Sequence, residues 1–234
     1  MIEAIIKSPF FSISLVIFLW VISVQINKLA KGNPIVNPLL ISILLGVVLL
    51  KITNISYDQV LVGGKYVTFF IAPATVAMVI NLYKNIHLLK ENFLAVIIGV
   101  FIGVIACVTS VFLLCKLFGL DEKLTVTLLP KSLTTAIGAT IAEEYGGYKD
   151  IATIAIVLTG VTGAVIAPTV MKVAKIKDPV AKGIGIGTSS HAVGTSKALE
   201  MGEVEGAMSG LSIALAGFMT VILMPLLIKL FEKI

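Results

Sequence analysis

The chain contains no arginine and few charged residues of any kind. All 18 basic residues among its 234 are lysines, and charged residues make up only 13% of the sequence. Because a soluble domain has about 25% charged residues, this composition excludes an ordinary water-soluble domain. The net charge of +5 lies in short loops, where it indicates membrane topology and not nucleic-acid binding.

Cysteine is also scarce, since Cys107 and Cys115 are the only two and share one apolar run. A disulfide framework or a thiolate metal site would need partners that the sequence does not contain, so we expect two buried thiols. The sequence has no nucleophile elbow, HExxH motif or paired metal motif. We therefore predict that the protein is not an enzyme and that it has no metal site and no cofactor.

Long apolar runs make up most of the remaining sequence. Hydrophobic residues account for 58% of the chain, and the mean hydropathy is +1.07. A membrane-spanning helix needs about 20 residues. Six runs are candidate spans, of which the second is short: Phe10–Ile26, Pro38–Leu50, Val67–Tyr83, Phe93–Cys115, Ile151–Met171 and Ala207–Ile228. The sequence therefore predicts an all-α integral membrane protein that crosses the bilayer several times.

Residues 124–230 contain the same unit twice. The first copy includes LLPKSLTTAIGATIAEEYGG at 128–147, and the second includes IGTSSHAVGTSKALEMGEVE at 186–205. An offset of 56 positions superimposes the two copies. The matched pairs are Ser132 with Thr188, Ala136 with Ala192, Ile137 with Val193, Gly138 with Gly194, Ala142 with Ala198, Glu144 with Glu200 and Gly146 with Gly202; a proline, Pro168 or Pro225, lies near the end of the apolar helix that follows each copy.

Each copy places a Ser/Thr/Gly-rich stretch inside a membrane segment, between Leu124 and Tyr145 and between Pro179 and Met201. Paired interruptions in repeated membrane segments are typical of the binding sites of transporters. We predict one membrane domain, residues 1–234, forming a polytopic, transporter-like bundle with two repeat-related interrupted helices, either broken or re-entrant. Four spans in residues 1–119 would form a scaffold, and the duplicated unit at 120–234 would carry the site.

The positions of the lysines bear on how the two interrupted segments are arranged. If both segments cross the bilayer, eleven lysines lie on one side and five on the other, whereas two re-entrant segments give eight and eight. Because loop lysines concentrate on the cytoplasmic side, this count slightly favours crossing. Two hairpins that enter from opposite faces would instead form an inverted repeat, which is the commoner arrangement in transporters, so both alternatives stay open.

The polar residues of the interrupted segments are suited to binding a small anion. A helix that begins inside the membrane presents free N–H groups and a partial positive charge. We expect hydroxyl groups at two such helix starts, one with Ser132, Thr134 and Thr135 and the other with Thr188, Ser189 and Ser190. The chemistry therefore indicates a small anion, which we interpret as a carboxylate.

Ionisable residues at membrane depth are costly and usually functional, and they complete the predicted site. The candidate substrate-binding residues are Lys131, Ser132, Thr134, Thr135, Gly138, Thr188, Ser189, Ser190, His191, Gly194, Thr195 and Lys197, with Thr75, Asn81 and Glu144 as further possibilities. A structural alternative stays open, because hydroxyls in membrane helices often bond only the preceding turn or a neighbouring helix. Lys131 would then extend to the interface, and Glu144 would lie at a solvated helix end.

At these residues the sequence resembles the LrgB/CidB family of bacterial membrane proteins. The motifs that carry the resemblance are APATVAMVINLYKN at 72–85, LLPKSLTTAIG at 128–138, EEYGG at 143–147, LTGVTGAVIAP at 158–168 and KDPVAKGIGIGTSSHAVGTSKALEMGEVEGAMSG at 177–210. The chain departs from the family pattern at Ala136, where proline usually follows the paired threonines. It also has Lys197 where arginine is frequent, which replaces a bidentate carboxylate clamp by a point charge.

The resemblance implies two alternative functions. One is transport of small monocarboxylates such as pyruvate, glycolate and glycerate. The same transport function is associated with plant plastid relatives of the family. The other is a holin/antiholin-like role in murein hydrolase export and cell lysis, together with a small LrgA/CidA-type membrane partner. A duplicated polar site favours the transporter, because a holin needs no deep polar site.

Further expectations concern coupling, location and assembly. An inside-negative potential drives an anion outward, so accumulation would require co-transport of H⁺ or Na⁺. His191 or Glu144 would carry the proton, since histidine titrates in the physiological range. We expect a multi-pass protein of the bacterial cytoplasmic membrane, in contact with membrane lipid, that forms a homo-oligomer and does not bind nucleic acid.

Overall fold

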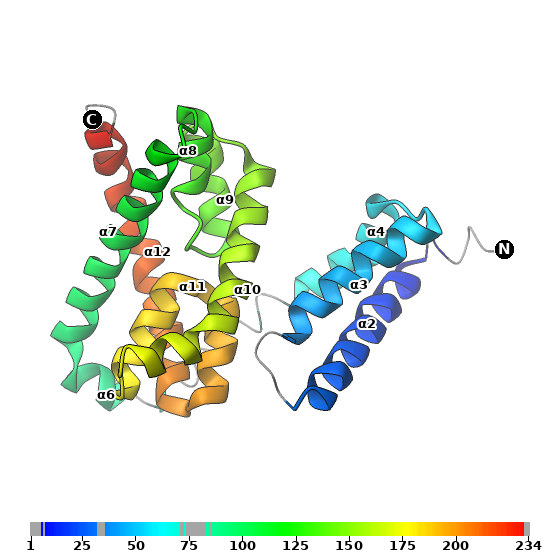
Figure 1. Cartoon of the computed structure of the whole chain (residues 1–234), viewed down its shortest axis with the longest axis horizontal. Coiled ribbons are helices and arrows are strands. Elements are labelled where there is room, and N and C mark those ends of the chain that lie inside the picture. The colour runs from blue at the N-terminus through cyan, green and yellow to red at the C-terminus, as the bar shows by residue number, and fades with distance from the viewer. Residues whose placement is uncertain are drawn as a thin grey trace. The chain divides into compact units, whose positions relative to one another are not determined.

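Figure 1 shows a computed structural model of the chain, which describes residues 6, 8–31, 36–70, 73, 83–84 and 86–231. These residues form helices and no strands. Four of the described helices are long and apolar enough to span a membrane: α2 (Pro9–Leu29), α7 (Phe93–Leu117), α10 (Lys149–Val173) and α12 (Glu203–Phe231). The predicted all-α, multi-pass architecture is confirmed to this extent. The chain divides into two compact units, Met1–Ala77 and Met78–Ile234.

In the first unit, α2 packs against α3 (Pro38–Thr53) and α4 (Tyr57–Phe69). The Asn37 side chain caps α3 by accepting hydrogen bonds from two backbone amides at its start, and a capping box formed by Ser56 and Gln59 begins α4. Helix α4 was not among the segments predicted from the sequence. The predicted span Val67–Tyr83 falls mostly outside the described residues.

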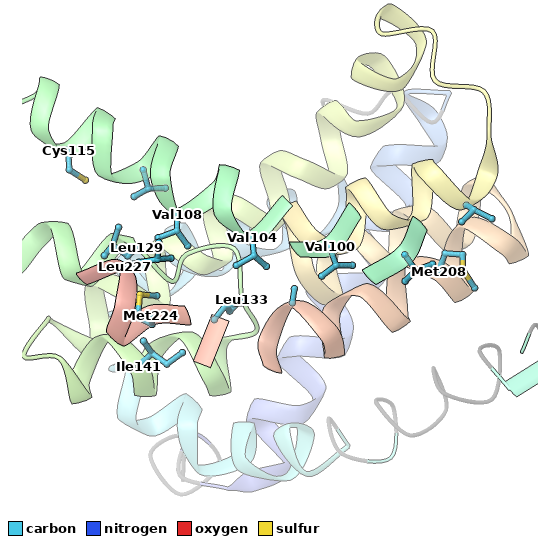
Figure 2. Close-up of a cluster of buried hydrophobic side chains, with 14 of the residues drawn as sticks. Val100, Val104, Val108, Cys115, Leu129, Leu133, Ile141, Met208, Met224 and Leu227 are labelled. Carbon is cyan, nitrogen blue, oxygen red and sulfur yellow. The ribbon is translucent and has the colours of Figure 1, made fainter. Parts of the chain in front are cut away.

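The second unit contains α6 (Ile86–Glu91), α7, α8 (Glu122–Leu128), α9 (Thr135–Glu144), α10, α11 (Pro179–Met201) and α12. One stripe of α7 is buried at helical spacing and packs against α8, α11 and α12. The stripe consists of Val96, Val100, Val104, Val108, Val111 and Cys115. Figure 2 shows Val100, Val104, Val108 and Cys115 of this stripe together with Leu129, Leu133, Met224 and Leu227, which belong to the same apolar core.

The first interrupted segment is a re-entrant hairpin, called hairpin 1 here, in which turns at 129–134 join α8 to α9. Its two ends lie side by side, because the backbone N–H of Tyr148 donates to Thr127 Oγ1 at 2.8 Å. The Lys123 ammonium also lies 4.2 Å from the centre of the Tyr148 ring. The chain therefore leaves this segment at the end where it entered. Pro130, which has no N–H to donate, lies in the unwound stretch.

The second interrupted segment, α11, is also a hairpin and is called hairpin 2. Its two arms meet at His191, whose backbone angles (φ 43°, ψ −145°) are not helical. The hairpin closes at its base, where Lys182 forms an ion pair of 3.5 Å with Glu205 at the start of α12. The slight preference for crossing segments, which rested on the lysine count, is therefore wrong. A few loop charges are weak evidence when the two arrangements differ by only three lysines per side.

The two hairpins enter the second unit from opposite ends of α7. The first arm of hairpin 2 lies along the first half of α7, where a Cβ added at Gly99 would come within 3.3 Å of Ile184 Cγ2 and one added at Gly103 within 2.6 Å of Thr188 Cγ2. Hairpin 1 lies along the other half of α7, with Glu122 and Val126 near Phe112. In Figure 1, α8 and α9 accordingly lie at the upper end of this unit and α11 at the lower end.

Contacts between each hairpin and the following helix of the other copy show that the repeat is inverted. A Cβ added at Gly160 of α10 would lie 2.9 Å from Val193 Cβ, and one added at Gly217 of α12 would lie 2.9 Å from Ile137 Cδ1. Val193 and Ile137 are repeat equivalents, and so are the two glycines near Pro168 and Pro225. The two halves of the duplicated unit therefore pack on each other in the same way with opposite orientation, as in many transporters.

Candidate functional site

The tips of the two hairpins meet beside the middle of α7 and α12. Ser132 of hairpin 1 and its repeat equivalent Thr188 of hairpin 2 line the same cavity, which is small at about 10 Å³. Thr220 of α12 and Cys107 of α7 also line it. Repeat-equivalent residues meet only near the axis that relates the copies, so this small cavity marks the pseudo-symmetry axis.

A much larger cavity, of about 400 Å³, lies between the hairpin tips and α10. Lys131 comes from hairpin 1, Ser189 and Ser190 come from hairpin 2, and Thr159 and Thr162 come from α10. Apolar side chains of α10 and hairpin 2 form the rest of the wall. The cavity therefore combines one cation and several hydroxyls with an apolar lining, which is the usual composition of a small-molecule site.

Lys131 is half-buried at the tip of hairpin 1 and has no ion-pair partner among the described residues. Three other lysines of the second unit do have such partners: Lys149 with Glu143, Lys182 with Glu205 and Lys197 with Glu200. An unpaired ammonium at membrane depth is unfavourable, and an anion in the cavity would compensate its charge.

The hydroxyls of hairpin 1 make no hydrogen bonds to the described residues, and none of them lines the larger cavity. Ser132 is buried at 8% exposure, and its hydroxyl has no hydrogen bond to the described residues. Thr134 is the N-cap residue of α9, but its side chain makes no capping hydrogen bond. Thr135 is the first, exposed residue of that helix. The predicted helix start with free hydroxyls is therefore present in hairpin 1.

The hydroxyls of hairpin 2 are already bonded to the protein. Thr188 donates to the carbonyl of Ile184 at 2.7 Å, and Ser189 donates to the carbonyl of Gly185 at 2.8 Å. The hydroxyls of Ser189 and Ser190 lie 3.0 Å apart. The expectation that these three residues lie at a helix start is wrong, because they form the last turn of the first arm and the break comes after them, at His191.

Behind the tip of hairpin 2, Thr195 links the hairpin to α12. Its hydroxyl donates to the carbonyl of His191 at 3.0 Å and lies 2.7 Å from the hydroxyl of Ser209. Both side chains are almost fully buried, and neither lines a described cavity. Thr195 therefore stabilises the tip and does not face a ligand.

His191 anchors hairpin 2 to α10. Its ring is buried, and Nε2 lies 2.8 Å from the carbonyl oxygen of Ile156. A positive φ at a residue with a side chain is unfavourable by about 1–3 kcal/mol and persists only where the surroundings enforce it. Gly160 of α10 leaves room for the His191 ring in this conformation, because any Cβ at position 160 would overlap the ring.

Two repeat-equivalent glycines allow the arms of the hairpins to close. A Cβ added at Gly138 would come within 2.8 Å of the carbonyl oxygen of Pro130, and one added at Gly194 would come within 2.5 Å of Ser190 Cβ. Their role in the structure is close packing of the arms.

Some predicted site residues are not brought to the cavity. Lys197 forms a 2.7 Å ion pair with Glu200 on its own helix turn, and Glu144 is exposed at the end of α9. Thr75 and Asn81 lie outside the described residues. No group of three or more His, Cys, Asp or Glu side chains among residues that the structure describes could hold a metal ion.

The contribution of α10 to the larger cavity was not among the predicted site residues. Thr159 and Thr162 lie one turn apart on the face of α10 that lines the larger cavity. The motif LTGVTGAVIAP, which contains both residues, was present in the sequence. Its threonines at i and i+3 beside two glycines are the signal that would have indicated a polar helix face.

Comparison with known proteins agrees with the resemblance noted in the motifs. Residues 16–230 match the LrgB-like family. Relatives named antiholin-like protein LrgB, from Bacillus cereus (strain B4264) and Bacillus anthracis (strain A0248), are each 34% identical over 219 residues, which cover 94% of this chain and 95% of the relative. No solved structure matches the chain.

Proposed function

The chain belongs to the LrgB-like family, and on this premise we propose that it is a membrane transporter of small monocarboxylates. The observation that carries the proposal is the Lys131 ammonium, which has no ion-pair partner among the described residues and lines a cavity of about 400 Å³ between two inverted hairpins. A carboxylate at this position would compensate the buried charge. The hydroxyls of Thr159, Thr162 and Ser190 would supply hydrogen bonds to it.

The size and charge of the cavity favour a small ligand with a single negative charge. Its volume lies toward the lower end of the range of about 300–1,000 Å³ that is usual for ligand pockets. One lysine balances one carboxylate, whereas a dicarboxylate would leave a charge uncompensated in an apolar surrounding, which is strongly unfavourable. Pyruvate, glycolate and glycerate have the required size and charge.

The names of the relatives support a second candidate more directly than they support transport. Those proteins are named antiholin-like, so an antiholin-like control of cell lysis, exerted with an LrgA/CidA-type membrane partner, is the alternative function for this chain. Such control would act through assembly of helices and would not require Lys131 or the cavity. A disturbed flux of organic acids would connect the two candidates, because lysis would then respond to transport.

We also propose that transport is coupled to a cation, with H⁺ as the first candidate and Na⁺ as the second. Of the two predicted proton carriers, His191 lies at the tip of hairpin 2, beside Ser190 of the cavity, whereas Glu144 lies exposed at the end of α9. The position of His191 makes it the better carrier, since a proton must reach the substrate site.

Uptake of labelled pyruvate, glycolate and acetate into proteoliposomes tests the proposal. The protein is reconstituted with a clamped membrane voltage, and a pH gradient is imposed without Na⁺. We expect saturable uptake that the gradient increases and that Lys131→Met abolishes. Absence of uptake under both H⁺ and Na⁺ gradients, together with an unchanged lysis phenotype of Lys131→Met in cells, would favour the antiholin-like function.

A further inference from the structure

The lining of the larger cavity changes from polar to apolar along α10. Thr159 and Thr162 line the cavity near the middle of this helix, and from Ile166 onward every residue of α10 in its wall is apolar. Met171, the last of these residues, follows Thr162 by nine positions, which corresponds to about 14 Å along a helix. The wall of the cavity therefore extends well beyond the threonine hydroxyls.

Hairpin 2 shows the same division, because its first arm runs antiparallel to α10. A Cβ added at Gly163 would overlap the Ser190 hydroxyl, and one added at Gly185 would lie 3.3 Å from Met171 Cε. Ser190 therefore lies at the end of the cavity that carries the threonines, and Ile186, one turn earlier in the arm, lies toward Met171. Both walls are polar at one end of the cavity and apolar at the other.

Lys131 belongs to the polar end. Its neighbour Ser132 shares the small cavity with Thr188, and Thr188 directly precedes the two serines of hairpin 2 that line the larger cavity. The lysine therefore lies by the tip of hairpin 2, where the hydroxyls are. The opposite end is lined by apolar side chains, of which three belong to one buried cluster: Ala167, Met171 and Ile186.

We infer that the larger cavity selects monocarboxylates with a short apolar tail, which lies between Ala167, Met171 and Ile186 while the carboxylate lies at Lys131. This inference rests on the proposed transport function and names its substrate class. The volume of about 400 Å³ corresponds to about 13 water molecules at about 30 Å³ each, so a tail of several carbons has room. Pyruvate ends in a methyl group and belongs to this class, whereas the terminal hydroxyl of glycolate or glycerate would be buried at the apolar end without a partner.

Two acids that differ only in their terminal group test this inference. Butyrate and 3-hydroxypropionate have the same charge and nearly the same shape, but one ends in a methyl group and the other in a hydroxyl. Titration of the purified protein, followed by its thermal stability, gives the Kd of each. We expect butyrate to bind at least about tenfold more tightly, because a hydroxyl buried without a partner is unfavourable. Equal affinity for the two acids would overturn the inference.

The series acetate, propionate and butyrate, measured on a variant, locates the tail. In the unmodified protein the affinity should rise about fourfold with each buried methylene. Ala167→Val narrows the apolar end, so we expect the ratio of butyrate affinity to acetate affinity to fall at least about fourfold. Ala155→Val is the matched control, because Ala155 lies on the same helix and lines neither the larger nor the small cavity, and its ratio should stay as in the unmodified protein. An unchanged ratio in a folded Ala167→Val would contradict the placement of the tail.

Failure of this inference can be distinguished from failure of the proposed function. If acetate, pyruvate and butyrate all leave the thermal stability of the unmodified protein unchanged, the monocarboxylate proposal itself fails. If they stabilise it with affinities that do not depend on the tail, only the selection of an apolar tail is wrong. The comparison of butyrate with 3-hydroxypropionate needs no variant, so it decides the question even if Ala167→Val does not fold.

Discussion

Hairpin 1 and hairpin 2 descend from the same repeated sequence but differ in which polar groups are free. In hairpin 1, the side chains of Lys131, Ser132 and Thr134 have no hydrogen bond or ion pair with the described residues, and the chain is unwound over 129–134. In hairpin 2, the corresponding stretch stays helical up to a single break at His191, and its hydroxyls bond to backbone carbonyls or to α12.

This difference indicates a division of roles within a duplicated site. Lys131 of hairpin 1 would bind the anion, and the bonded groups of hairpin 2 would hold the opposite wall in place. Pro130 accounts for part of the difference, because proline removes a helical hydrogen bond, whereas its equivalent Ile186 continues the helix. Duplication therefore preserved the fold of the two hairpins while the chemistry of their tips diverged.

The largest expected effect is a loss of stability when the ion pair at the base of hairpin 2, between Lys182 and Glu205, is broken. Lys182→Met leaves the carboxylate of Glu205 buried at 8% exposure without its partner. Removing one member of a buried ion pair costs about 3–5 kcal/mol, and we expect about 3 kcal/mol because Lys182 is partly exposed. Thermal unfolding in detergent measures this. The exposed pair at the base of hairpin 1 is the control, since Lys149→Met should change stability little.

A smaller effect is expected where α10 supports the tip of hairpin 2. Gly160→Ala places a Cβ against the His191 ring and Val193, and overpacking of this kind costs about 1–3 kcal/mol. Gly210→Ala in α12 is the matched control, because a Cβ at Gly210 meets nothing within 4 Å. The control should keep or slightly raise the thermal stability. Equal stability of the two variants would contradict the proposed support of His191.

Thr195→Ala tests whether hairpin 2 acts through its internal hydrogen bonds. The change leaves the buried hydroxyl of Ser209 without its partner, which costs about 1–3 kcal/mol. We expect lower thermal stability and a monocarboxylate affinity that changes by less than the stability does. A large loss of affinity with unchanged stability would instead assign Thr195 to the ligand, as the sequence suggested.

Ser132→Ala tests whether the small cavity takes part in binding. The Ser132 hydroxyl has no hydrogen bond to the described residues, so its loss should leave thermal stability almost unchanged. Because Ser132 lines the small cavity and not the larger one that contains Lys131, we expect pyruvate affinity in a binding assay to change by much less than the roughly tenfold that a lost hydrogen bond of about 1.5–3 kcal/mol to a charged group would give. A tenfold loss of affinity would instead assign Ser132 to the anion site, as the sequence suggested.

The sequence predicted the positions of both interrupted segments because the duplication and the loss of apolar character can be recognised in the linear sequence. It did not predict that the segments re-enter, since the closing contacts of Thr127 with Tyr148 and of Lys182 with Glu205 join residues 21 and 23 positions apart whose pairing depends on the fold. The ion pair of Lys197 with Glu200 could be expected from their i,i+3 spacing. Lys197 was instead predicted to bind the ligand because of its positive charge.

The contribution of α10 also required the structure. Thr159 and Thr162 have the same sequence character as the small residues that pack membrane helices, and only the position of the hairpin tips shows which face of α10 lines a cavity. Conversely, Lys131 could be proposed as an anion-binding residue from the sequence alone, because a lysine inside a membrane segment is rare whatever its surroundings.

The most direct test of the proposed anion site is the monocarboxylate-dependent thermal stability of the purified protein and of Lys131→Met. A ligand at about 100 times its Kd stabilises the folded state by about 2.7 kcal/mol. We expect pyruvate or glycolate to raise the unfolding temperature of the unmodified protein and of Lys149→Met, and to have no effect on a folded Lys131→Met. Equal stabilisation of Lys131→Met would contradict the claim that this lysine binds the anion.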